Sequence, residues 1–119
     1  MKDKKYVYGY DFGTLSCRLV IVNVNNGEIV AQGSENYPDG VISEKLPGSN
    51  VKLPPGWFLQ NPDDYITTMS YLSKKLLVEA SIHPKDIISI GSAFTNCTMM
   101  PINKAGRVLC QIKKWRKNP

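Results

Sequence analysis

The residues best equipped for chemistry lie together near the start of the chain. They are Asp11-Phe12-Gly13-Thr14-Leu15-Ser16-Cys17-Arg18, which combine a carboxylate, a glycine, two hydroxyls and a guanidinium. Gly13 allows close backbone approach to a polyphosphate, hydroxyls and N–H groups donate hydrogen bonds to it, and Arg18 supplies a forked cation. Asp11 can hold Mg²⁺ through water. The segment therefore predicts a polyphosphate site with an orienting metal.

The same residue types also suit a turn that binds nothing. Asp and Thr side chains commonly satisfy the backbone groups of a tight turn. The two commonest phosphate-binding patterns, Gly-x-x-x-x-Gly-Lys-Ser/Thr and Gly-x-Gly-x-x-Gly, occur nowhere in the sequence. From these residues alone, a phosphate site and a purely structural hairpin tip both remain open.

The elements around this turn predict a three-stranded antiparallel meander. Strand-forming residues fill 6–10 and 18–24, on either side of the turn. Asn25-Asn26-Gly27 is a strong hairpin signal, and it leads into a third strand over 28–32. Proline and glycine are frequent in 36–60, which predicts a long ordered surface loop, and such loops are usually functional.

A helix follows this loop. Asn61 is a good N-cap, Pro62 suits the first helical position, and acidic residues come next. An apolar stripe at spacings of three and four predicts about five helical turns and a face for the core; its members are Ile66, Met69, Leu72, Leu76 and Ala80.

The last elements complete an α/β domain with a mixed sheet. The run Ile87–Gly91 is apolar and predicts a strand buried on both faces. Residues 99–102 and 108–110 flank a turn at 103–106 and predict a second hairpin.

Composition indicates one globular domain and excludes several other classes. The chain has 119 residues, 42% of them hydrophobic and 21% charged. Its net charge of +5 comes from a basic tail over 104–119, so we expect no nucleic-acid or anionic membrane partner. Lys113-Lys114-Trp115-Arg116-Lys117 mixes basic and aromatic residues as some nucleic-acid binders do, but a solvated terminus is the better interpretation. No apolar run approaches a membrane span or a signal peptide, which predicts a cytoplasmic protein.

Three cysteines, Cys17, Cys97 and Cys110, match neither a disulfide framework nor paired zinc ligands. We expect free thiols in a reducing compartment. Cys97 could be a nucleophile, but nothing in the sequence brings His83, the lone histidine, near it.

Two separated motifs in the right order resemble the amino-terminal part of the FGGY carbohydrate kinases. They are Gly9-Tyr10-Asp11-Phe12-Gly13-Thr14 and the run Pro55-Gly56-Trp57-Phe58-Leu59-Gln60-Asn61-Pro62-Asp63-Asp64-Tyr65. Further runs are similar to the ribulokinase branch of this family, namely Tyr37–Ile42, Leu46–Gly48, Leu53–Trp57 and Phe94–Ile102. The resemblance covers the chain from Tyr6 to Pro119.

This resemblance implies a ribonuclease-H-like, actin-like ATPase fold. Residues 1–119 would form the amino-terminal part of the first of two lobes, with the second lobe and the general-base Asp after residue 119. ATP and Mg²⁺ would bind at the family's phosphate motif, which maps onto Asp11, Gly13, Thr14, Leu15, Ser16 and Arg18. Leu15 would contribute backbone only, and the sugar would contact Asn96 and Cys97.

The implied activity is ATP-dependent phosphorylation of a ketopentose, with L-ribulose in arabinose catabolism as the first candidate. Two positions depart from the ribulokinase pattern, which has Asp where Ala93 stands and Ala or Ser where Asn96 stands. D-ribulose and xylulose therefore stay open as substrates.

Two other classes also stay open: a non-catalytic actin-like nucleotide-binding module, and an interaction domain that pairs with a second copy. We expect the chain alone to be inactive and to form a homo-oligomer through an exposed lobe surface.

Overall fold

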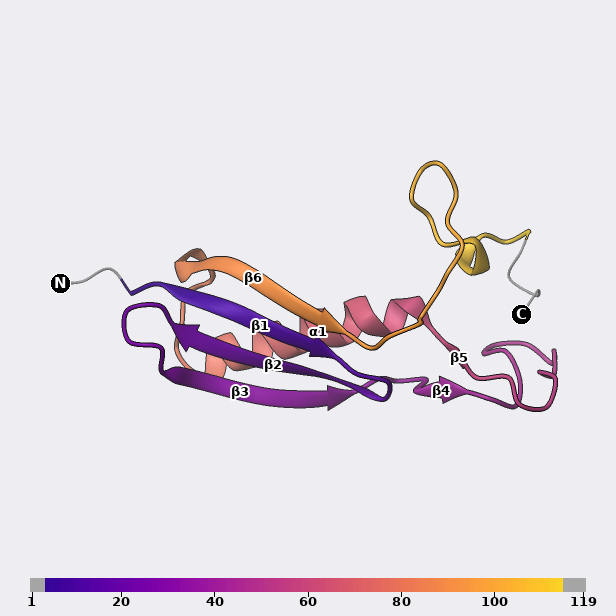
Figure 1. Ribbon diagram of the computed structural model, residues 1–119, viewed down its shortest axis with the longest axis horizontal. Coiled ribbons are helices and arrows are strands. Elements are labelled where there is room, and N and C mark those ends of the chain that lie inside the picture. Colours follow the sequence, from indigo (N-terminus) through magenta and orange to yellow (C-terminus); the bar gives the residue numbers. More distant parts are fainter. Residues whose placement is uncertain (1–3, 115–119) are drawn as a thin grey trace.

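The computed structural model describes residues 4–114 and gives an elongated molecule of 58 × 29 × 23 Å. Figure 1 shows a sheet and one long helix forming the body, with irregular segments extending from one end. The predicted basic tail over 104–119 lies partly outside the described residues, and so does the predicted basic and aromatic run from Trp115 onward. Within the described part, no helix has the length and hydrophobicity needed to span a bilayer.

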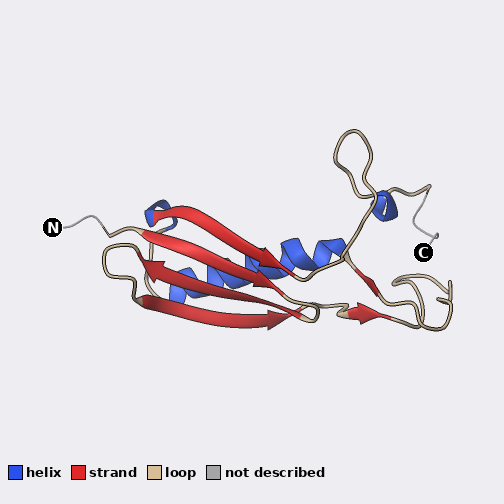
Figure 2. Cartoon of the chain, in the orientation of Figure 1, coloured by secondary structure: helices blue, strands red, loops and turns tan. Residues whose placement is uncertain are grey.

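The body is a four-stranded mixed sheet in the order β3-β2-β1-β6. Strands β1 (Tyr6–Phe12), β2 (Ser16–Asn23) and β3 (Ile29–Asn36) form the predicted antiparallel meander, and β6 (Ile87–Phe94) adds to β1 in parallel (Figure 2). The predicted third strand thus exists and runs four residues further than its pattern indicated. The α/β class with a mixed sheet is confirmed.

Helix α1 (Pro62–Glu79) packs against β2 and β3 on one face of the sheet. The Asn61 side chain caps it by accepting a hydrogen bond from the Asp63 N–H at 3.0 Å, as predicted. Its predicted stripe is partly wrong, because Ile66 is 63% exposed whereas Thr68 is buried between the positions of Asp64 and Leu72. A strict spacing of four follows the helix face that the sheet covers.

The core lies between α1 and alternate residues of β1 and β2. A row of aromatic side chains lines β1, and Phe12 at its end stacks on Phe94 of β6 with ring centroids 4.6 Å apart. Gly33 of β3 admits the helix, since a Cβ there would lie 3.2 Å from a methyl carbon of Leu76. Close packing of α1 on β3 therefore depends on this missing side chain.

Strand β6 contradicts its predicted burial on both faces. Seven of its eight residues are exposed, including Ile90 at 63% and Phe94 at 62%. The cause is its position at the sheet edge, beyond the width that α1 covers (Figure 1).

Two irregular regions also differ from expectation. The loop over 36–60 starts within β3 and contains the short pair β4 (Val41–Ile42) and β5 (Leu59–Gln60). The hairpin predicted over 99–110 is reduced to one bridge between Ile102 and Val108, followed by the 3₁₀ helix η2 (Leu109–Gln111). A further 3₁₀ helix, η1 (Pro84–Asp86), precedes β6.

Candidate functional site

Sheet topology gathers the predicted site residues at one end of the body. Because β1 and β6 are parallel, their carboxyl ends meet at the same edge, and the N-terminus of α1 points there too (Figure 1). Thr95 follows β6, and its N–H donates to the carbonyl of Phe12 at 2.8 Å. The turn after β1 and the segment after β6 are therefore neighbours, which is a common arrangement for ligand sites in α/β sheets.

Asp11 lies in β1, one residue before its end, rather than in a loop. It pairs across the hairpin with Arg18, whose Nε and Nη2 both donate to the Asp11 Oδ2 at 2.8 and 2.7 Å. Both side chains are about half exposed, at 52% and 53%, on the sheet face away from α1. The Asp11 carboxylate and the Arg18 guanidinium therefore form an ion pair on a solvent-exposed surface, and each neutralises the charge of the other.

The turn itself spans Gly13 to Ser16, closed by a hydrogen bond from the Gly13 N–H to the Ser16 carbonyl at 2.9 Å. A Cβ on Gly13 would lie 3.0 Å from Arg18 Nη2 and 3.1 Å from the Ser16 oxygen, so a larger residue here would force the Arg18 side chain and the turn backbone to shift slightly. Thr14 and Leu15 are exposed and Ser16 is half-buried. The side chains of Thr14 and Leu15 therefore face solvent, whereas the Leu15 carbonyl accepts a hydrogen bond from the Tyr37 N–H at 2.9 Å.

Asn96 and Cys97 lie just after β6, and both are exposed. Cys97 has a φ of 64°, in the left-handed region that costs a non-glycine residue about 1–3 kcal/mol. Such strain is concentrated at functional sites. Here the left-handed conformation of Cys97 belongs to the turn that follows β6.

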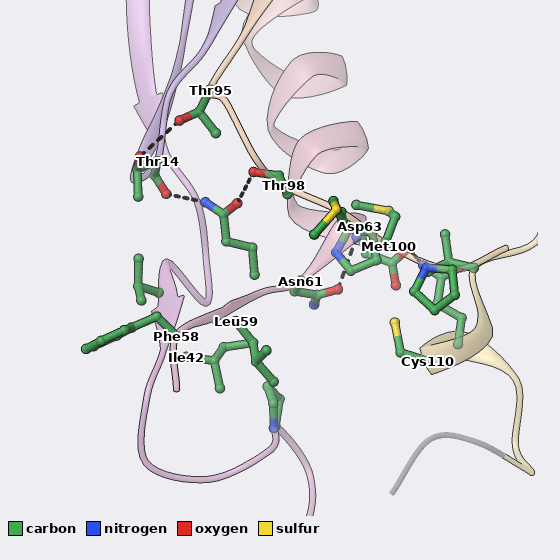
Figure 3. Close-up of a pocket in the computed structure, with 18 of the residues that line it drawn as sticks. Thr14, Ile42, Phe58, Leu59, Asn61, Asp63, Thr95, Thr98, Met100 and Cys110 are labelled. Atoms are coloured by element: carbon green, nitrogen blue, oxygen red, sulfur yellow. Dashed lines mark hydrogen bonds between the residues drawn. The ribbon is translucent and has the colours of Figure 1, made fainter. Parts of the chain in front are cut away.

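One pocket of about 1060 Å³ brings several of these residues together. Thr14, Asn96 and Cys97 line it, together with the β4–β5 pair, the start of α1 and residues of the segment over 98–111. Figure 3 labels Thr14, Ile42 and Cys110 among the lining residues. The other predicted phosphate residues lie outside its lining; they are Asp11, Gly13, Leu15, Ser16 and Arg18. Through Thr14, the pocket thus borders both the turn and the predicted sugar-contacting residues Asn96 and Cys97, which we call the sugar segment.

Sequence reasoning missed the polar side chains that connect these parts. Gln60 donates to the carbonyl of Thr14 at 2.7 Å and accepts from the hydroxyls of Tyr65 and Thr98 at 2.6 and 3.2 Å. The hydroxyls of Thr14 and Thr95 lie 3.3 Å apart. Gln60 falls within the motif used above, but no spacing rule identifies a single glutamine before an N-cap as a connecting residue.

A buried carboxylate fixes the start of the long loop to the start of α1. Asp64 Oδ2 accepts a hydrogen bond from the Asp39 N–H at 3.0 Å, and the N–H of Gly40 is a second donor. Asn61 Nδ2 also donates to Asp39 Oδ2 at 2.7 Å. Burial raises the pKa of Asp64, an effect that these N–H donors oppose. This network places the Val41–Ile42 strand beside the pocket.

The cysteines are free, as predicted, and differ in their surroundings. Burial raises the pKa of Cys17 to about 11 and also raises that of Cys110. Both thiols are therefore protonated and unreactive near neutral pH. His83 accepts a hydrogen bond from the Lys85 N–H at 3.1 Å, in the turn before β6, so it has a capping role.

The exposed turn suits a polyphosphate carrying magnesium. Among residues 4–114, no three His, Cys, Asp or Glu side chains form a metal-binding group. Mg²⁺ bound with a nucleotide needs only one or two carboxylates, because phosphate oxygens and water complete its shell. The half-exposed Asp11 carboxylate could supply one such ligand, and the hydroxyls of Thr14 and Ser16 could donate hydrogen bonds to phosphate oxygens.

Comparison with known families decides which group of proteins this is. Residues 6–118 match the N-terminal domain of the FGGY family of carbohydrate kinases. The chain belongs to the FGGY family. The resemblance inferred from Gly9–Thr14 and Pro55–Tyr65 is thereby confirmed.

Ribulokinases are among the similar family members. The ribulokinase of Geobacillus thermodenitrificans (strain NG80-2) is 43% identical over 116 residues, and that of Anoxybacillus flavithermus (strain DSM 21510 / WK1) is 44% identical over 116 residues. Each alignment covers 98% of this chain and 20% of the relative. The chain thus spans about a fifth of the length of these FGGY relatives.

Solved structures agree with the actin-like sugar-kinase fold. Gluconate kinase from Lactobacillus acidophilus superposes with a TM-score of 0.69 at 23% identity, over 89% of this chain and 18% of that chain. Xylulose kinase from Lactobacillus acidophilus superposes with a TM-score of 0.67 at 23% identity, over 88% of this chain and 18% of that chain. The fold expected for an FGGY amino-terminal region is confirmed.

Proposed function

We propose that the whole protein is an ATP-dependent kinase of a ketopentose, with L-ribulose as the first substrate to test. The observation that carries the proposal is the shared pocket, in which Thr14 of the phosphate turn and Asn96 and Cys97 of the sugar segment line one space. Ribulokinases at 43% and 44% identity support the choice of substrate.

The turn after β1 would hold the phosphates of ATP. Thr14 and Ser16 would donate hydrogen bonds to phosphate oxygens, Leu15 would contribute its backbone N–H, and Gly13 keeps the turn compact. Arg18 would supply positive charge beside Asp11, which would hold Mg²⁺ through water. When bound, Mg²⁺ neutralises charge that develops on the transferring phosphoryl group. Because positioning dominates this chemistry, the chain's main contribution is a fixed turn.

The segment after β6 would form one wall of the sugar site. The Asn96 amide is exposed at the pocket and can both donate to and accept from sugar hydroxyls. Because this amide is larger than the Ala or Ser of the ribulokinase pattern, D-ribulose and xylulose remain competing substrates within the proposal.

The catalytic base would come from elsewhere in the whole protein. The general-base Asp that the family resemblance implies would follow residue 119, so we propose that the 119-residue chain alone does not turn over. A second lobe would complete the adenosine and sugar sites.

The test is Asp11→Asn in the whole protein. Turnover should fall to background while the melting temperature hardly changes, because an exposed ion pair stabilises by less than about 1 kcal/mol. The matched control is Glu79→Gln, which removes one exposed carboxylate at the far end of α1 and should leave turnover intact.

Retained activity in Asp11→Asn, or its unfolding, would contradict the assignment. Nucleotide binding by the unsubstituted protein with no dependence on any pentulose would favour the non-catalytic module instead.

A further inference from the structure

We propose that Gln60 is a positioning residue for phosphoryl transfer, which fixes the phosphate turn relative to the sugar segment. This inference rests on the proposed function of those two parts. Gln60 is the second residue of β5, and its single amide contacts the Thr14 carbonyl in the turn and the Thr98 hydroxyl after β6. These contact residues are 46 and 38 positions away in sequence.

Geometry defines the orientation of this amide. The Thr14 carbonyl can only accept a hydrogen bond, so the group 2.7 Å from it must be the Gln60 NH₂. The Gln60 carbonyl oxygen then faces the hydroxyls of Tyr65 and Thr98 at 2.6 and 3.2 Å, and both hydroxyls can donate to it. A flipped amide would put two carbonyl oxygens against each other at Thr14. One rotamer therefore satisfies all three partners.

The amide is also held rigidly from the helix side. Tyr65 lies in the first turns of α1, and its ring packs against Phe12 and Tyr37 with centroids 5.8 and 5.0 Å away. Phe12 and Tyr37 are buried, at 4% and 5% exposure, so Tyr65 is anchored in the core. Gln60 itself is half-buried. Tyr65, held by the core, thus holds Gln60 in place, and Gln60 in turn holds the Thr14 carbonyl of the turn.

Other direct links between the turn and the sugar segment are weak or limited to the strand end. The Thr14 and Thr95 hydroxyls are exposed and 3.3 Å apart, and the Thr95 N–H bonds to Phe12, before the turn begins. Figure 3 shows Thr14, Thr95 and Thr98 at the same end of the pocket, with dashed lines for the Thr14–Thr95 contact and for the hydrogen bonds that join Thr14 and Thr98 to the Gln60 amide. Gln60 therefore sets the distance between the donor and acceptor subsites, to which the rate of transfer is sensitive.

The test separates the two contacts of Gln60 in the whole protein. Gln60→Glu keeps the acceptor for Tyr65 and Thr98 but places a carboxylate oxygen against the Thr14 carbonyl. We expect kcat to fall roughly 10- to 100-fold, with KM for ATP and for the sugar changing about threefold or less, because alignment and not binding is lost. The matched control is Gln32→Glu, the same chemical change at an exposed position of β3, and it should leave kcat unchanged.

The other contact is tested at Thr98, whose side chain is exposed. Thr98→Val should lower kcat and Thr98→Ser should restore it, because only the serine variant keeps the hydroxyl donor. A purely structural role predicts normal kcat in all folded variants, and that result would overturn the proposal.

A readout without catalysis separates this inference from the proposed function. Amide hydrogen exchange over 13–16 and 95–98 should accelerate at both segments in Gln60→Glu and at neither in Gln32→Glu. Unchanged exchange would overturn the positioning role even in an active kinase. Accelerated exchange in a protein that phosphorylates no pentulose would support the link and refute the proposed function.

Discussion

Replacing the buried carboxylate of Asp64 should loosen the loop that borders the pocket. Asp64 is 5% exposed and accepts hydrogen bonds from the backbone N–H groups of Asp39 and Gly40. Asp64→Ala leaves both donors without their acceptor, at about 1 to 3 kcal/mol each when buried. It also removes a negative charge from the first turn of α1, worth about 0.3 to 1 kcal/mol.

Partial exposure of the freed N–H groups to water lowers the sum, so we expect a loss of about 3 kcal/mol, or a melting temperature lower by about 10 °C. Asp64→Asn keeps a carbonyl acceptor and should lose only about 1 kcal/mol. Urea denaturation followed by circular dichroism measures both variants. Equal losses for Ala and Asn would refute the hydrogen-bonding argument.

Comparing the unsubstituted protein with Asp64→Asn at several pH values tests the protonation of Asp64. Burial raises the pKa of Asp64 above its ordinary value of 3.8, so the folded protein binds a proton more readily than the unfolded chain. The protonated group therefore contributes its whole stabilisation at a pH below its ordinary pKa, and this contribution is lost as the pH rises through the raised pKa. Relative to Asp64→Asn, the unsubstituted protein should gain stability on acidification through this window. A constant difference would show that burial does not govern this carboxyl.

Two further predictions concern the sugar segment and the exposed sheet edge. Asn96→Ala in the whole protein should change kcat/KM among pentuloses by roughly five- to 150-fold, equivalent to about 1 to 3 kcal/mol, while KM for ATP changes much less; an equal change for every sugar would remove Asn96 from the specificity site. The 119-residue chain alone should self-associate in light scattering across a dilution series, because Ile90 is 63% exposed on an edge strand. Ile90→Lys should reduce this association and Val78→Lys, at a 78% exposed helix position, should not; a monomer at all concentrations would contradict the prediction.

Local patterns determined the elements whose causes are local. Asn61 and Pro62 defined the start of α1, and Asn25-Asn26-Gly27 defined the turn between β2 and β3, because caps and tight turns depend on a few neighbouring residues.

Long-range contacts decided the rest, since sequence spacing does not encode them. Burial of β6 depends on what covers the sheet edge, and Ile66 lost its place in the stripe because the sheet meets α1 along a narrower line. The direct pairing of Asp11 with Arg18 follows from the strand register.

Sequence by itself determined the kind of chain: an α/β unit whose hairpin turn carries phosphate-binding residue types ahead of a capped amphipathic helix. Only the tertiary structure decided that Thr14 shares a pocket with Asn96 and that Gln60 bridges the turn and Thr98. The physical reason is that these contacts join residues far apart in the chain, and parallel pairing of β1 with β6 brings them to one edge of the sheet.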